Sequence, residues 1–212
     1  GNGVLGLTIS KFLIKKNKKL NIAIIGPKNR FGSASVASGA MINVFAEMEN
    51  DALSNKVLSE RFKMTVNALK MWPKYHKELE KESGNTIQYD MGTYVINSSR
   101  GTHFEDMHFK YISNLKHKYH KFNIKEIDPE KINGLKTRPL DRPSKAIHLP
   151  DGKINSKELI ESIEKILNKS TNVKFFDSIV EHVNYENKEV LTSKKDIVKA
   201  ANIVFANGAF AQ

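Results

Sequence analysis

Three glycines at the start of the chain constrain its fold more than any other feature. They lie in residues 1–6, GNGVLG, with the spacing G-x-G-x-x-G, directly before an amphipathic stretch at residues 4–20. In a dinucleotide-binding unit, Gly1 would permit a tight turn, Gly3 would let the backbone approach a pyrophosphate, and Gly6 would let the helix pack closely. The N-terminus of that helix would direct N–H groups and its positive dipole end at the phosphates. The spacing alone is equally consistent with a glycine turn that only starts a helix.

The next segment supplies the context that such a glycine turn requires. Residues 21–25 are a short apolar run that ends at Gly26 and Pro27, as expected of a buried parallel strand. Glycine turn, helix and strand make a βαβ unit without its first strand. We therefore predict an α/β fold with a Rossmann-like parallel sheet, whose first strand lies outside this chain. The helix face expected to be buried carries Leu5, Ile9, Phe12 and Leu13.

One expected residue of a dinucleotide site is missing. An acidic side chain usually stands about 20 residues after the glycine turn and binds the ribose hydroxyls, but Gly26 occupies that place. Ribose recognition would then use backbone groups, Asn29 or water, or the site would bind weakly or not at all. Lys28 and Arg30 would suit a 2′-phosphate instead. We expect a glutamate introduced at Gly26 to leave the affinity for the dinucleotide unchanged or to raise it, provided that the glycine is not needed for a positive φ.

A second informative segment is the uncharged, small-residue stretch 31–41, FGSASVASGAM. Small side chains let backbone and hydroxyl groups lie against a flat ring system or a phosphate. The alternative is a flexible glycine-serine loop. Such loops seldom run directly into an apolar segment like residues 41–45, which should be buried.

With these segments, the chain resembles the family of FAD-dependent D-amino-acid oxidases, glycine oxidases and sarcosine oxidases. The resemblance implies bound FAD and oxidation of an amine-bearing small molecule, above all an amino acid, by hydride transfer to the flavin. It identifies no catalytic residue here and places the arginine for the substrate carboxylate beyond residue 212. The cofactor-binding positions that it implies are Gly1, Gly3, Val4, Leu5, Gly6, Gly26, Ser33, Ser35, Ala37, Ser38, Gly39, Met41, Val180, Ala206 and Gly208.

Later landmarks follow the order of that family. Residues 87–96 read as a strand with a central glycine, and residues 146–159 as a short strand, an Asp-Gly turn and a helix capped by Asn155 or Ser156. We expect further strands at residues 173–176, 179–183, 189–191, 196–198 and 201–206. The predicted organisation is an FAD-binding part at residues 1–85, an inserted part of an α+β substrate domain at 86–150, and a return to the FAD-binding domain at 151–212. The C-terminal part of the family fold would lie outside this chain.

Two further stretches read as helices. Residues 52–83 form one long helix or two helices that meet near Pro73, with an apolar stripe for packing at Leu58, Phe62, Val66, Leu69 and Trp72. Residues 104–119 form a surface helix. His117 and His120 are three residues apart, but no carboxylate stands near enough to complete a metal site. Residues 135–144 are predicted as a loop, and Asp128 as the N-cap of a helix that Pro129 begins.

Composition sets limits on partners. The formal net charge is +11, but the basic residues are mostly scattered lysines, which favours a solvated surface over a nucleic-acid face. The sequence has no cysteine, which excludes disulfides and thiol chemistry within it, and no window of about 18 apolar residues that would span a membrane. We expect a cytoplasmic protein with no metal and an undetermined oligomeric state. The alternative function is a non-catalytic or decayed dinucleotide-fold protein, for instance an RNA-associated one.

Overall fold

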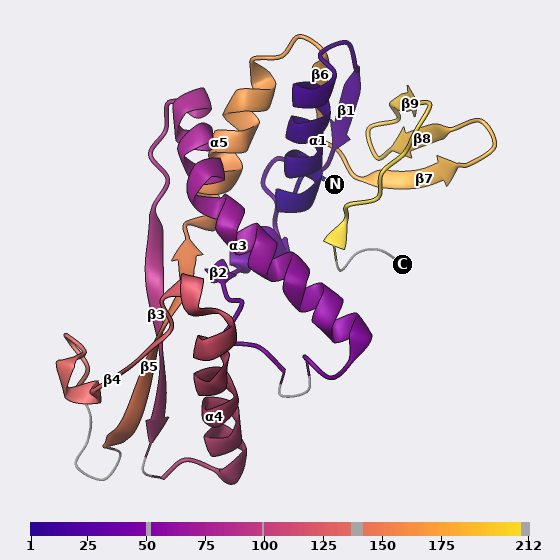
Figure 1. Cartoon of the computed structure of the whole chain (residues 1–212). Coiled ribbons are helices and arrows are strands. Elements are labelled where there is room, and N and C mark those ends of the chain that lie inside the picture. The colour runs from indigo at the N-terminus through magenta and orange to yellow at the C-terminus, as the bar shows by residue number, and fades with distance from the viewer. Residues whose placement is uncertain (50–51, 99, 137–141, 209–212) are drawn as a thin grey trace. The chain divides into compact units, whose positions relative to one another are not determined.

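The computed structural model describes residues 1–49, 52–98, 100–136 and 142–208 (Figure 1). The chain divides into two compact units. The first unit comprises Gly1–Ala40, His76–Gln88 and the chain from Asn155 onward; the second comprises Met41–Tyr75 and Tyr89–Ile154. The functional division into an FAD-binding domain and an inserted substrate domain stays a prediction.

The first unit contains the predicted helix and a parallel strand pair. Helix α1 runs from Val4 to Lys16, and strand β1 follows at Ile22–Ile25. Strand β6, Val173–Phe176, pairs with β1 in parallel, from Ile22 opposite Val173 to Ile25 opposite Phe176. Helix α5, Ser156–Asn168, precedes β6 and begins at the predicted cap, because Asn155 Oδ1 accepts the N–H groups of Lys157 and Glu158. The parallel sheet and mixed α/β character are thus confirmed.

A three-stranded antiparallel sheet completes the first unit. Its strands are β7 (Val180–Asn184), β8 (Glu189–Thr192) and β9 (Ile197–Lys199), close to the predicted positions. The predicted strand at residues 201–206 is wrong, since the described residues 201–208 contain no strand. An apolar run becomes a strand only where another strand pairs with its backbone groups, and the local pattern carries no information on that partner.

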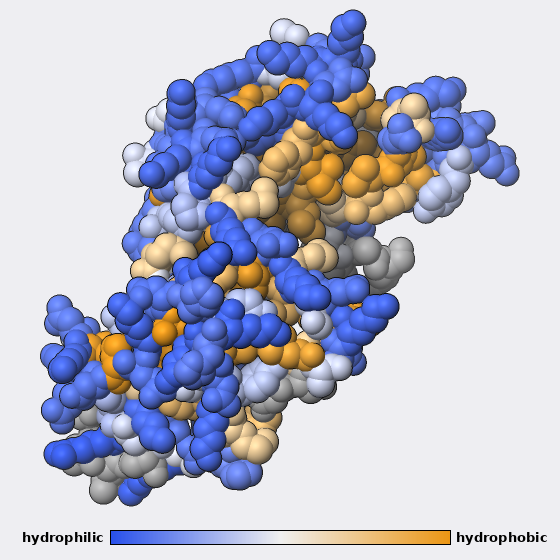
Figure 2. All heavy atoms as spheres, in the orientation of Figure 1, coloured by the Kyte–Doolittle hydropathy of each residue, from blue (hydrophilic) through white to orange (hydrophobic). Residues whose placement is uncertain are grey.

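The buried face of α1 differs from the predicted one. The exposed fractions of Leu5 and Phe12 are 67% and 47%, and Ile9 and Leu13 are also exposed. The face that is buried instead carries Gly6, Leu7, Ser10 and Lys11. Periodicity identified an apolar stripe but could not identify the side on which α1 packs. In Figure 2, hydrophobic residues gather on the surface over the region where Figure 1 shows α1 and β7.

Two polar groups explain how that face of α1 tolerates burial. Ser10 Oγ donates to the Gly6 carbonyl oxygen at 2.8 Å within the helix. The ammonium group of Lys11, which is only 4% exposed, forms an ion pair with Glu82 at 2.8 Å. Glu82 lies near the end of helix α3, Lys56–Ser83, whose residues from His76 onward belong to the first unit.

The second unit is built on an antiparallel sheet. Strand β5 (Pro143–Ile154) pairs with β2 (Met41–Ile42), with β3 (Tyr89–Ser98) and with β4 (Lys125–Ile127). Helix α4, His103–Lys118, matches the predicted helix within one residue at each end. Strand β3 carries the predicted central glycine, Gly92, with a φ of +105° at a register shift against β5.

One continuous core fills the second unit. The predicted stripe of α3 contributes Phe62, Val66 and Leu69, and the N-terminal part of α3 is a single helix through Pro73. The Phe45 side chain is fully buried, and its ring meets the rings of Phe62, Tyr119 and Phe122 edge-on. The stripe is therefore packing, as its periodicity indicates.

The predicted Asp-Gly turn at Asp151 and Gly152 is wrong. Both residues lie inside β5, where Gly152 pairs with Met91 on one side and Ile42 on the other. Gly152 is required for close approach, because a Cβ there would lie 2.3 Å from the Asp90 carbonyl oxygen. The dipeptide is typical of turns, but here paired strands on both sides hold it extended.

The Asp151 side chain instead forms a buried clamp. Its Oδ2 accepts the N–H groups of Val44, Phe45 and Ala46 at 3.0, 2.9 and 2.8 Å, and the residue is fully buried. Its Oδ1 has no hydrogen-bond partner among the described residues. Burial raises the pKa of the Asp151 carboxyl above its ordinary value, although the three N–H donors oppose this shift. We call this arrangement the Asp151 clamp.

Three smaller expectations can be compared with the structure. Asp128 caps a helix that Pro129 begins, but that helix is a 3₁₀-helix of only three residues, Pro129–Lys131. Of the predicted loop at 135–144, residues 137–141 lie outside the described residues, and Pro143 and Ser144 already belong to β5. No helix in the described part of the chain is long and apolar enough to cross a membrane.

Candidate functional site

The glycine turn forms the centre of the site, within the first unit. A Cβ on Gly1 would lie 2.1 Å from the Ala206 carbonyl oxygen, and one on Gly6 would lie 1.9 Å from the Gly1 carbonyl oxygen. A Cβ on Gly3 would lie 2.9 Å from Ser35 Oγ. The three glycines therefore permit backbone and hydroxyl groups to approach more closely than any side chain would allow. The structure brings Ser35 and Ala206, both predicted site residues, to this turn.

The N-terminus of α1 is suited to an anion. Gly3 is the N-cap and offers no side chain, and the first turn contains no acidic residue. The amides of Val4, Leu5 and Gly6 belong to the turn that has no acceptors within its own helix. Ser35 Oγ accepts the Val4 N–H at 3.1 Å. The positive dipole end of α1 and the N–H groups of its first turn favour a phosphate group at this place.

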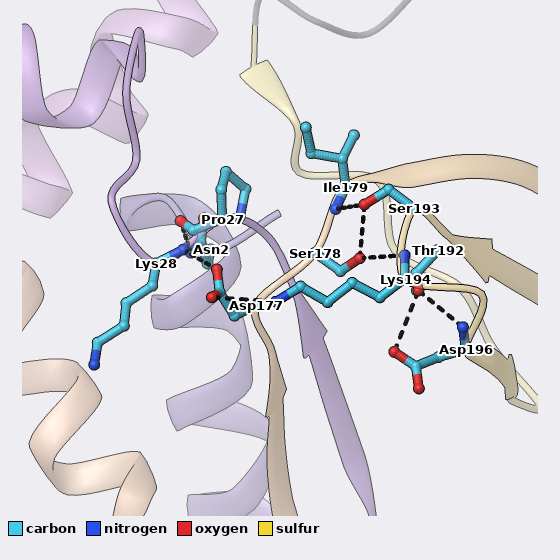
Figure 3. Close-up of polar contacts among 10 residues, drawn as sticks. All are labelled: Asn2, Pro27, Lys28, Asp177, Ser178, Ile179, Thr192, Ser193, Lys194 and Asp196. Atoms are coloured by element: carbon cyan, nitrogen blue, oxygen red, sulfur yellow. Dashed lines mark hydrogen bonds and ion pairs between the residues drawn. The ribbon is translucent and has the colours of Figure 1, made fainter.

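Gly26 is held in close contact with the glycine turn, which argues against the expectation that a glutamate there leaves the affinity for a dinucleotide unchanged or raises it. A Cβ on Gly26 would lie 2.4 Å from Asn2 Oδ1. The Asn2 Nδ2 group donates to the Pro27 carbonyl oxygen at 2.9 Å, which fixes the amide in that place (Figure 3). The absence of a side chain at position 26 is thus a packing requirement.

Sequence reasoning missed the polar residues that support the turn. Asn2 is buried, and its carbonyl oxygen accepts the Arg30 Nε–H at 2.9 Å. Arg30, at a φ of +48°, also forms an ion pair with Glu164 of α5. An amide side chain between two glycines was a signal for Asn2, but no local pattern links Arg30 to Glu164.

A carboxylate also lies beside the end of β1. Asp177 directly follows β6, and its Oδ1 accepts the Lys28 N–H at 2.8 Å (Figure 3). Its Oδ2 lies 3.4 Å from the Lys194 ammonium nitrogen. The Lys28 N–H, followed by Lys194, lowers the pKa of Asp177 below its ordinary value.

The small-residue stretch forms a short helix, α2, at Ala34–Ala37, with Ser33 as its N-cap. Ser38 Oγ accepts the Ala40 N–H at 2.9 Å, which turns the chain at the end of the stretch. A Cβ on Gly39 would have no atom within 4 Å, so this glycine faces open space.

The remaining predicted positions are not brought to the turn by any interaction of the described residues. Val180 is the first residue of β7 and is half exposed. Gly208 has a φ of +60°, in the region that favours glycine. Met41 begins β2 in the second unit and is 52% exposed. Their roles toward a cofactor stay predictions.

The donor set fits a dinucleotide. A glycine turn that a Cβ would fill, an uncapped helix N-terminus and a hydroxyl at the same point suit a pyrophosphate. Among the described residues, His117 and His120 included, no three His, Asp or Glu side chains form a group that could hold a metal ion.

Comparison with known proteins identifies the fold. The glycine oxidase of Geobacillus kaustophilus matches with a TM-score of 0.78 and 18% identity, over 100% of this chain and 54% of that one. The glycine oxidase of Bacillus cereus ATCC 14579 matches with a TM-score of 0.76 and 19% identity, over 99% and 56%. The iminodiacetate oxidase of Chelativorans sp. BNC1 matches with a TM-score of 0.71 and 18% identity, over 94% and 52%.

The chain thus spans about half the length of these structures. No curated protein matches it. The family model described as FAD dependent oxidoreductase matches residues 1–212. The resemblance found in the sequence is confirmed, and the chain belongs to the family of FAD dependent oxidoreductases that includes the D-amino-acid oxidases.

Proposed function

We propose that the full-length protein binds FAD non-covalently and oxidises an amine-bearing small molecule, above all an amino acid. One observation carries the proposal: the glycine turn meets Ser35 and Ala206 at the N-terminus of α1, in a chain that belongs to this family. The solved structures of similar fold include a glycine oxidase and an iminodiacetate oxidase. Glycine and iminodiacetate are both amine-bearing acids, which supports the proposed substrate class. When bound, the flavin would supply the redox chemistry by accepting a hydride from the carbon that carries the amine.

The residues of the turn would bind the pyrophosphate. Gly3 would let the phosphates approach the backbone, and the amides of Leu5 and Gly6 would donate to phosphate oxygens. Ser35 accepts the Val4 N–H, and its hydroxyl hydrogen would be directed to a phosphate oxygen at the same time. In this way the first helical turn and α2 would hold one anion together.

The other predicted positions would line the rest of the cofactor. The uncharged stretch from Ser35 to Met41 would lie against the flavin, since Gly39 has open space at its Cα. The backbone of Val180 would contact the adenine, and the segment from Ala206 to Gly208 would contact the cofactor beside Gly1. Gly26 would leave room for the Asn2 side chain and would itself make no contact with the cofactor.

Flavin content tests the binding site. Replacing Gly3 by valine places side-chain atoms where Ser35 Oγ lies 2.9 Å from the Cβ position, so the full-length protein should be purified without flavin absorbance. Thr8→Val, on the same helix but beyond the turn, is the matched control and should retain it. Undiminished flavin in Gly3→Val would refute the assigned site.

Flavin reduction tests the substrate class. Under anaerobic mixing, a panel of amino acids and N-methyl amino acids should bleach the flavin band, and Gly39→Leu should abolish the bleaching while circular dichroism stays unchanged. Bleaching by NADH or a hydroxy acid, and by no amine, would contradict amine oxidation. A protein that carries no flavin but retains nucleic acid with a steep salt dependence would favour the RNA-associated alternative.

A further inference from the structure

We propose that Asp177 supplies the carboxylate that position 26 lacks, and that it binds the hydroxyl groups of the adenosine ribose of FAD. The proposal rests on FAD binding by the full-length protein. No local sequence pattern pointed to Asp177 as a cofactor contact.

The strand register places Asp177 at the carboxyl ends of the parallel strands β1 and β6, where ligands of such sheets bind. Strands β1 and β6 run in parallel, and their last paired residues are Ile25 and Phe176. The Gly26 N–H then donates to the Phe176 carbonyl oxygen at 3.1 Å. The next residue of each strand is therefore Gly26 on one side and Asp177 on the other. Ligands of open α/β sheets bind outside the carboxyl ends of the strands, which is the edge that both positions share.

Position 26 itself has no room for an acid. The Asn2 amide occupies the space that a Cβ on Gly26 would need, and its own bond to the Pro27 carbonyl holds it there. A carboxylate at this edge therefore has to come from the neighbouring strand. Asp177 directly follows β6, and its side chain accepts the Lys28 N–H, so it reaches the segment that follows Gly26.

The Asp177 side chain is oriented and accessible. One oxygen is fixed by the Lys28 N–H at 2.8 Å, and the side chain remains 59% exposed. A carboxylate has about four acceptor positions, so the contacts with Lys28 and Lys194 leave capacity for two hydroxyl donors. Figure 3 shows the carboxylate between the segment of Lys28 and the side chain of Lys194.

Lys194 does not block this role. Its ion pair with Asp177 is 3.4 Å long and both side chains are largely exposed. Exposed pairs of this kind contribute little, so a ligand can replace one at small cost. The Lys28 N–H, followed by Lys194, lowers the pKa of Asp177, which favours the ionised carboxylate, and an ionised acceptor makes the stronger hydrogen bonds to hydroxyl groups.

Asp177→Asn is the decisive variant, because an asparagine oxygen can still accept the Lys28 N–H while the charge is lost. The full-length protein is stripped of flavin and titrated with FAD, following the quenching of flavin fluorescence. We expect the affinity of Asp177→Asn for FAD to fall roughly 10- to 100-fold, as expected for the loss of hydrogen bonds to a charged group. Glu181→Gln, which removes an exposed carboxylate of β7 that is paired with Lys195, is the matched control and should bind as the wild type does.

A modified cofactor provides a second measurement, in which the ligand is changed instead of the protein. FAD whose adenosine ribose lacks both hydroxyls should bind wild-type protein as weakly as intact FAD binds Asp177→Asn, and the two changes together should add no further loss. If removal of the ribose hydroxyls leaves wild-type affinity unchanged, or if Asp177→Asn binds FAD normally, Asp177 is not the ribose ligand, while the proposed function stands. Wild-type protein that binds no FAD overturns both.

Discussion

The Asp151 clamp predicts a large loss of stability on truncation. Asp151→Ala leaves the N–H groups of Val44, Phe45 and Ala46 without their acceptor, in a place where Val44 and Phe45 are buried. Each unsatisfied buried donor costs about 1–3 kcal/mol, so three of them cost roughly 3–9 kcal/mol. Removal of a buried carboxylate offsets part of this, because burial, which raises the pKa of Asp151, disfavours the charged form. We expect a net loss of about 3–5 kcal/mol in the free energy of unfolding.

Asp151→Asn separates the acceptor from the charge. Its oxygen can replace Oδ2, but its NH₂ group then replaces Oδ1, which has no partner among the described residues. The loss should be smaller, about 1–2 kcal/mol, from one unsatisfied donor group. Asp90→Ala, which removes an exposed carboxylate paired with Lys153 on the same sheet, is the control and should cost less than about 1 kcal/mol.

Urea unfolding of the full-length protein measures these differences, and amide hydrogen exchange at residues 44–46 locates them. Exchange at those three amides should accelerate in Asp151→Ala and not in Asp90→Ala. If Asp151→Ala unfolds at the same urea concentration as the control and the three amides exchange as in the wild type, the clamp contributes nothing to stability.

The same carboxyl predicts a pH dependence. Because burial raises the folded-state pKa of Asp151 above its unfolded-state value, the stability it contributes is present in full below the unfolded pKa. That contribution is lost as the pH rises through the folded pKa. The stability of the wild type relative to Asp151→Asn should therefore increase as the pH falls from neutral toward about 4. A difference that shrinks as the pH falls would contradict the assigned shift.

Two further predictions concern the glycines. Gly6→Ala should destabilise the protein by about 1–3 kcal/mol, because its Cβ would lie 1.9 Å from the Gly1 carbonyl oxygen, whereas Gly39→Ala should be neutral or slightly stabilising in the same thermal unfolding assay. Gly26→Glu should displace Asn2 and lower both stability and flavin content; a variant as stable as the wild type would show that Asn2 can move aside.

Short-range patterns in the sequence predicted much of the architecture. The glycine turn, the helix after it and the apolar run at residues 21–25 led to the helix and the parallel strand, and the periodicity of α3 identified its buried stripe. Asn155 or Ser156 was predicted as a helix cap from its side chain and position, and Asn155 is the cap. Each of these depends on a few neighbouring residues, so the sequence alone carries the signal. The family followed from the order of such segments along the chain.

Tertiary structure decided everything that depends on a distant partner. Asp177 meets Lys28 across 149 positions, and Ala206 approaches Gly1 from the other end of the chain. The Asp151–Gly152 pair was predicted as a turn because local chemistry favours one, yet strands on both sides hold it extended. The apolar stripe of α1 was read correctly, but α1 packs through the side that carries Gly6, Leu7, Ser10 and Lys11, because the segments that pack against a helix decide which side is buried. A local pattern limits the conformation of its own segment, whereas burial and side-chain pairing are set by whichever remote segment packs against it.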